Sequence, residues 1–142
     1  MADTSKLNKV TEYIIEKLSN EFGIDLTKKK LRIGKSGVYK EFTGVSNDNK
    51  IVLFVCHHSG LTSGDNIPTA KLNSLFTKCY LLEKVNAEKK YIYFTNKDFY
   101  EIFRAKSNGI IENIELKLFN GLPVEYENIL SEVIRNASKE MS

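Results

Sequence analysis

The residues of this chain whose types and spacing could do chemistry gather in one stretch, residues 41–71. Glu41 stands first, His58 closes a run of apolar residues, and Asp65 lies in a segment rich in glycine and serine. Carboxylate oxygens and imidazole nitrogens both bind divalent metal ions, so these three residues form a candidate metal site with mixed ligands. Because a nearby cation stabilises charge in metal-assisted hydrolysis, Glu41, His58 and Lys71 are the candidate catalytic residues.

These residues do not have the spacing of an established metal-binding motif, and a second interpretation stays open. In that interpretation Glu41 faces solvent on a strand, and His57 and His58 end a strand with ordinary hydrogen bonds. Glu12 or Glu16, upstream in the chain, could add oxygen ligands to a metal site. Mg²⁺ or Mn²⁺ is the expected cofactor only if the metal interpretation holds, and otherwise we expect no cofactor.

Basic residues form the second candidate site. Residues 28–35 hold five cations in eight positions without an acid, although the net charge of the chain is only +3. Such a run can follow a phosphate backbone. A solvated loop that leads into a strand is the other interpretation of the run. With two cations on one side of a later helix, the candidate nucleic-acid-binding residues are Lys28, Lys29, Lys30, Arg32, Lys35, Lys71 and Lys78.

Two further patterns predict structure rather than chemistry. Residues 34–37, Gly-Lys-Ser-Gly, contain part of a phosphate-binding loop but lack its upstream glycine, so they predict a polar turn. Cys56 adjoins two histidines, but neighbouring residues of a strand point to opposite faces, so neither imidazole need reach the thiol. We expect Cys56 and Cys79 to be core thiols in a reducing compartment.

Hydrophobic periodicity predicts the elements that position these residues. The order is helix, three strands, helix, strand, helix, strand, helix, which indicates one domain over residues 1–142. The fold class is α/β (α+β), with a mixed central sheet flanked by helices. The expected elements are a helix over 5–22, strands over 31–33, 38–46 and 50–56, a helix over 68–85, a strand over 90–95, a helix over 96–107, a strand over 114–119 and a helix from 123.

The hairpin over residues 38–56 is central to this arrangement. Its turn, Asn47-Asp48-Asn49, supplies residues that tolerate positive φ. Its second strand is apolar on both faces from Ile51 to Val55, which is typical of a central strand covered above and below. The strand over 114–119 alternates in polarity, so we expect it to be half-exposed at an edge.

Composition indicates an ordinary globular protein, with 42% hydrophobic and 27% charged residues. No apolar run approaches the roughly 20 residues that span a bilayer. The first residues lack the apolar core of a signal peptide. We therefore expect a cytoplasmic protein with no membrane partner.

The stretch Glu41–Cys56 resembles the hairpin of the PD-(D/E)XK nuclease superfamily, which is also called the restriction-endonuclease-like fold. In that family a carboxylate near the end of the first strand is followed, across a short turn, by an apolar strand that ends in acid-x-Lys. The order of elements from about Ser5 to Thr95 is similar too: helix, strand, hairpin, helix, strand. The resemblance implies two carboxylates converging on Mg²⁺ and a lysine that stabilises charge or orients the attacking water.

This chain departs from the family at the three positions that matter for the reaction. Where the resemblance places the aspartate, the second acid and the lysine, the chain has Thr43, Phe54 and Cys56. None of these can supply a carboxylate or an ammonium group. The resemblance therefore implies the architecture of a nuclease without its standard metal-dependent activity.

Three functions follow as hypotheses. The first is a nuclease-like domain that binds DNA or RNA through the basic residues, or serves as a partner subunit. The second is a divalent-metal-dependent nuclease with a relocated site at Glu41, His58 and Asp65. The third is a protein-interaction module, in a complex or a homodimer, that uses an exposed aromatic edge around Tyr91, Tyr93 and the final helix. An enzyme acting on a small molecule is a fourth alternative.

Overall fold

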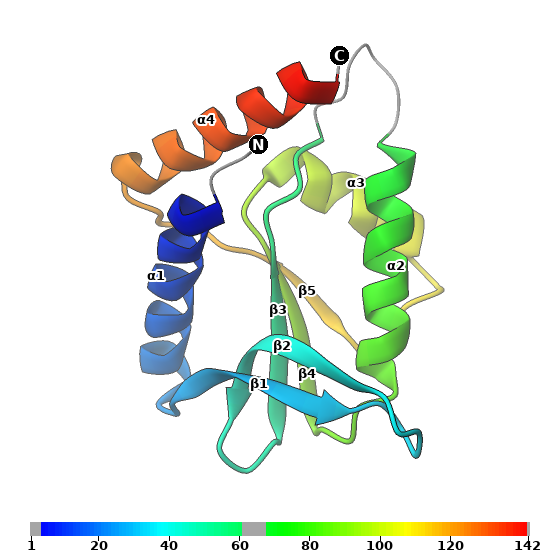
Figure 1. Ribbon diagram of the computed structural model, residues 1–142. Coiled ribbons are helices and arrows are strands. Elements are labelled where there is room, and N and C mark those ends of the chain that lie inside the picture. Colours follow the sequence, from blue (N-terminus) through cyan, green and yellow to red (C-terminus); the bar gives the residue numbers. More distant parts are fainter. Residues whose placement is uncertain (1–3, 61–67, 142) are drawn as a thin grey trace.

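The fold is that of a computed structural model, which describes residues 4–60 and 68–141 (Figure 1). A five-stranded mixed sheet is flanked by four helices, as the sequence predicts. The elements are α1 (Thr4–Phe22), β1 (Leu26–Arg32), β2 (Tyr39–Ser46), β3 (Ile51–Cys56), α2 (Thr69–Glu83), β4 (Lys89–Phe94), α3 (Lys97–Ser107), β5 (Glu115–Leu118) and α4 (Val124–Met141).

The strands lie in the sheet in the order in which they occur in the chain. β2 is antiparallel to both of its neighbours, β1 and β3, whereas β3, β4 and β5 are parallel. The carboxyl ends of these three parallel strands therefore meet at one edge of the sheet. In Figure 1 this edge points towards α4, and β1 and β2 cross in front of the opposite ends.

The sheet separates two apolar cores. On one face, residues of α1 and α4 pack against Leu53, Tyr91 and Tyr93. On the other, residues of α2 and α3 pack against Val52, Ile92 and other residues of the sheet. β3 contributes fully buried residues to both cores, which confirms the predicted central strand.

Local sequence explains most of the boundaries. Gly23 follows α1 with φ 68°, which ends the helix. Asn49 closes the hairpin turn with φ 61°, which confirms that the turn uses a residue that tolerates positive φ. Asn96 caps α3 by accepting a hydrogen bond from the Phe99 N–H at 2.8 Å. Pro68 precedes the first residue of α2 rather than lying inside it, and α2 ends at Glu83, two residues before the predicted end.

Two expectations are wrong. The basic run is not a loop, because Lys28, Lys29 and Lys30 lie within β1, which begins at Leu26 instead of residue 31. Tyr91 and Tyr93 do not form an exposed edge: each is only 6% exposed, because β4 lies between β3 and β5 and its tyrosines enter the core beneath α1 and α4.

The remaining elements agree with the sequence. β5 is an edge strand, as expected, with alternating exposed and half-buried residues. Both cysteines are buried and neither is in a disulfide. The helix expected from residue 123 is α4, whose side chains Tyr126, Ile129, Leu130 and Val133 are buried or half-buried. No helix in the described part of the chain is long and apolar enough to cross a membrane.

Candidate functional site

The predicted hairpin opens into a fork. Partner residues of β2 and β3 face each other only at Gly44–Leu53 and Val45–Val52. At the next step the Val55 N–H donates a hydrogen bond to the side chain of Thr43, with 3.4 Å between N and Oγ1, instead of to a backbone carbonyl. We call this region, formed by Thr43, Phe54, Val55 and Cys56, the fork.

A bulge in β2 marks the place where the strands separate. Thr27 of β1 lies opposite Val45, but Lys29, two residues further on, lies opposite Phe42. β2 therefore has one extra residue between Phe42 and Val45, which bends the strand. Gly44 lies in this bulge, and a Cβ there would come within 3.0 Å of Ile15 and 3.2 Å of Leu53. A glycine thus lets β2 approach α1 closely.

The three positions that the resemblance assigns to catalytic groups hold neutral, packed side chains. Thr43 supplies its hydroxyl oxygen to the backbone of β3. The ring of Phe54 lies 4.8 Å from the ring of Phe42, centroid to centroid. Burial raises the pKa of the Cys56 thiol to about 11, so it is not an activated thiolate.

His57 and His58 lie on opposite sides of the sheet, as the alternation predicts. His57 Nε2 lies 2.8 Å from the Thr11 hydroxyl on α1, and Nδ1 lies 3.1 Å from the Thr95 hydroxyl after β4. Each hydroxyl also lies near a carbonyl oxygen, that of Leu7 at 3.0 Å for Thr11 and that of Cys56 at 3.3 Å for Thr95. Because a neutral imidazole donates from only one nitrogen, one of the two hydroxyls donates its proton to the ring and the other can donate to its carbonyl. Burial, with a smaller contribution from His58, lowers the pKa of His57 to about 4. His57 is therefore a neutral link between α1 and the sheet.

His58 lies on the α2 side among cations. Its ring contacts Phe99 edge-on at 5.5 Å. Burial lowers its pKa, and the charges of Lys78 and Lys71 lower it further. The Lys78 ammonium lies over the Phe54 ring at 5.6 Å, and the Lys71 ammonium donates to the Ser59 carbonyl at 3.2 Å. Positive charge therefore collects beside the end of β3, where the resemblance requires acids.

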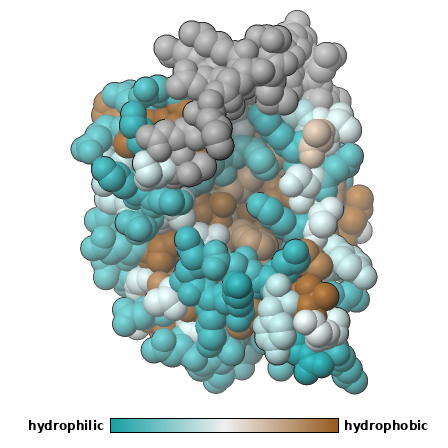
Figure 2. Space-filling model, in the orientation of Figure 1, coloured by the Kyte–Doolittle hydropathy of each residue, from teal (hydrophilic) through white to brown (hydrophobic). Residues whose placement is uncertain are grey.

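A groove of about 480 Å³ lies on the other side of the fork, between α1 and the start of β1. Thr43, Glu12, Glu16 and Lys28 are among its lining residues. The two glutamates that the sequence offered as added ligands thus do lie beside the fork. In Figure 2, which has the orientation of Figure 1, apolar surface is recessed at the centre of the molecule above strongly hydrophilic side chains.

Glu41 and His58, two of the three proposed metal ligands, lie in different surroundings. Glu41 is exposed on β2 opposite Lys30 of β1, and His58 lies next to two ammonium groups. Asp65 lies outside the described residues. Within residues 4–60 and 68–141, no group of three or more His, Cys, Asp or Glu side chains is placed to hold a metal ion.

The seven candidate nucleic-acid-binding residues do not share one surface. Lys71 and Lys78 flank the end of β3, on the face that α2 covers. Lys29 donates to the side chain of Asn49, and Arg32 donates to the carbonyls of Lys35 and Ser36 in the turn after β1. The cations therefore form two groups, one at the fork and one along β1.

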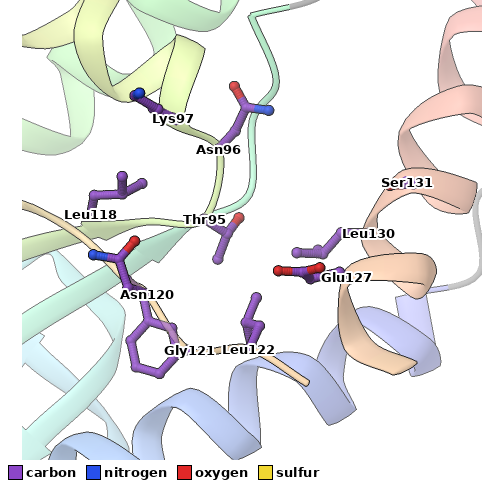
Figure 3. Close-up of a pocket in the computed structure, with 11 residues that line it drawn as sticks. Thr95, Asn96, Lys97, Leu118, Asn120, Gly121, Leu122, Glu127, Leu130 and Ser131 are labelled. Atoms are coloured by element: carbon purple, nitrogen blue, oxygen red, sulfur yellow. The ribbon is translucent and has the colours of Figure 1, made fainter. Parts of the chain in front are cut away.

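A second hollow, of about 370 Å³, lies at the carboxyl ends of β4 and β5 (Figure 3). Thr95 and Asn96 line it from β4 and the start of α3, and Leu122 and Glu127 line it from the far side. The Lys97 ammonium, also at this hollow, lies 4.0 Å from the Glu101 carboxylate one helical turn away. This arrangement offers polar contacts.

Sequence reasoning missed the two threonines that hold His57. Parallel pairing sets Cys56 beside Phe94, so the next residues, His57 and Thr95, necessarily meet. That signal requires knowledge of the register between β3 and β4. Thr11 had a weaker signal, as a polar residue one turn after Leu7 on the apolar side of α1.

No family model matches this chain, and neither does any curated protein or solved structure.

Proposed function

We propose that this chain is a nuclease-like domain without metal-dependent activity that binds nucleic acid through phosphate contacts. One observation carries the proposal: beside the fork, Phe54 fills the position of an acid, and the Lys78 ammonium lies over its ring. Lys71 and His58 add further basic groups. A site of this charge attracts phosphate and repels a divalent cation.

The surroundings of the fork also support phosphate binding without metal-dependent hydrolysis. Phe42 and Cys56 are buried, so a carboxylate introduced at the fork would have to lose much of its hydration, which is costly. Phosphate contacts need only cations at the rim, and they position a nucleic acid without reading its bases. The arrangement therefore suits binding better than hydrolysis.

The test is a titration of fluorescein-labelled oligonucleotides, single-stranded and duplex, followed by fluorescence anisotropy. We expect affinity to fall steeply between about 50 and 200 mM salt, because cations are released from the phosphates on binding. Lys78→Ala should weaken binding and reduce the salt slope by roughly one unit. Lys106→Ala is the matched control, since Lys106 is exposed in the last turn of α3, away from the fork.

His58 provides an independent signal. A bound phosphate offsets the charges of Lys71 and Lys78, so nucleic acid should raise the pKa of His58 in an NMR titration. No binding at low salt would remove the proposal. Cleavage in Mg²⁺ or Mn²⁺ that is lost in Glu41→Ala and His58→Ala would replace it with a relocated nuclease site.

A further inference from the structure

The hairpin of β1 and β2 has one covered face and one open face. Leu31 and Ile33 are buried in the core beneath α2, so Lys30 and Arg32, which alternate with them, point the other way. Arg32 lies directly opposite Tyr39 in the strand register. We call the surface formed by Lys28, Lys30, Arg32 and Tyr39 the hairpin face.

Tyr39 is an unusual residue on this face. It is 58% exposed, and its neighbour Val38 is 51% exposed, although both belong to types that normally pack inside. β1 runs from the foot of α1 towards the foot of α2, so most of the hairpin face extends beyond α1 (Figure 1). The aromatic ring of Tyr39 is therefore exposed to solvent beside the cationic residues of the hairpin face.

The hairpin face is held in place by its own turn. Arg32 Nε donates to the Ser36 carbonyl at 2.6 Å, and a second guanidinium nitrogen donates to the Lys35 carbonyl at 2.7 Å. These bonds use two of the five guanidinium N–H groups, which leaves three for a ligand. The Gly34 N–H donates to the Lys84 carbonyl at 3.0 Å and so joins the turn to the end of α2. Arg32, fixed in this way, loses little conformational entropy when it binds a ligand.

We infer that the hairpin face is a binding site for single-stranded nucleic acid, in which Tyr39 stacks on a base and Lys28, Lys30 and Arg32 contact successive phosphates. This inference rests on the proposed function and names its ligand class. Cations two residues apart on a strand are about 6.6 Å apart, a spacing that can track an extended backbone. An exposed tyrosine beside them needs an unpaired base, because the bases of a duplex already stack on one another.

The test compares three tyrosine variants on a labelled single strand and on its duplex, at low salt. Tyr39→Ala should weaken single-strand binding roughly fivefold or more, whereas Tyr39→Phe keeps the ring and should bind like the wild type. Tyr80→Ala is the matched control, because Tyr80 is 61% exposed on α2 and should leave the affinity unchanged. The affinity for the duplex should change little in all three variants.

The outcomes separate this inference from the proposed function. If the wild type binds but Tyr39→Ala equals Tyr80→Ala, or if single strand and duplex weaken equally, the stacking site is overturned and phosphate binding stands. If the wild type binds neither oligonucleotide, the proposed function itself fails. Urea denaturation of each variant shows whether a lost signal reflects unfolding, and Tyr39→Phe gives a folded reference at the same position.

Discussion

The two ends of β2 have opposite environments. Residues 42–46 enter the core at the fork, where Phe42, Val45 and Ser46 are fully buried, whereas residues 39–41 lie exposed on the hairpin. The bulge at Gly44 is close to the boundary between them. One strand therefore supplies both the closed fork and the open hairpin face.

This difference shows how the chemistry of the chain is distributed. Burying an ionised group without a partner is costly, and the fork contains none: its groups are an aromatic ring, a hydroxyl and a protonated thiol. Charges are kept where water reaches them, beside the fork and along β1. We therefore expect the fork to contribute mainly to stability, whereas binding is the role that we propose for the hairpin face. Variants at each region test the two expectations separately.

The largest expected effect is on stability at the fork. Phe42→Ala removes a fully buried ring that packs against Phe54, and it should lower the free energy of unfolding by about 3–5 kcal/mol. Tyr39→Ala, three residues away on the same strand, should lower it by at most about 1 kcal/mol. Urea denaturation measures both, and equal losses would contradict the division of β2 into two regions.

The second effect is a pH dependence that originates at His57, the residue next to the fork. His57 has a pKa of about 4 in the folded chain and about 6.5 when unfolded, so the unfolded state binds the proton first as the pH falls. The stabilising contribution of neutral His57 is therefore complete above about pH 6.5. It is lost progressively as the pH falls towards 4, by about 2–3 kcal/mol.

The measurement is a series of urea denaturations between pH 7 and pH 4. His57→Gln has no titrating group and should show a flatter profile over this range, although it is less stable at pH 7. A wild-type profile as flat as that of the variant would show that His57 is not held neutral between Thr11 and Thr95.

The sequence predicted the fork better than the hairpin face. A continuous apolar run located β3, and strand alternation placed His57 and His58 on opposite sides of the sheet. Both follow from local geometry. No sequence pattern indicates the extra residue in β2, because packing against Ile15 and Leu53 decides where the bulge forms. In the sequence, only the glycine at position 44 is typical of a bulge.

The errors have physical causes too. In β1 the cations of residues 28–30 are exposed on both faces, since an edge strand is not fully covered, so alternation is visible only near Leu31. From the sequence alone we expect an exposed aromatic edge around Tyr91 and Tyr93. Their rings are nevertheless buried, and burial raises the pKa of Tyr93 to about 12. Which strand becomes central depends on the long-range order of the sheet, which no local pattern fixes.

A smaller effect tests the bulge itself. Gly44→Ala places a Cβ against Ile15 and Leu53 and should cost about 1 kcal/mol of stability through overpacking. Gly37→Ala, in the hairpin turn, has open space around the new carbon and should change stability by less than about 0.5 kcal/mol. Adding Ile15→Val to Gly44→Ala should recover part of the loss. A Gly44→Ala variant as stable as Gly37→Ala would mean that β2 can move away from α1 without cost.

The smallest effect lies on the hairpin face and decides between two roles for one residue. Glu41 is an exposed acid opposite Lys30, so its charge opposes the approach of phosphates. Glu41→Gln should tighten oligonucleotide binding about two- to threefold at low salt, and the gain should shrink as salt screens the charge. Glu112→Gln, an exposed acid between α3 and β5, is the matched control and should have no effect. A metal ligand behaves in the opposite way, because Glu41→Gln would then abolish a metal-dependent activity and gain nothing in binding. The sign of the change at this one position therefore separates a phosphate-binding surface from a relocated catalytic centre.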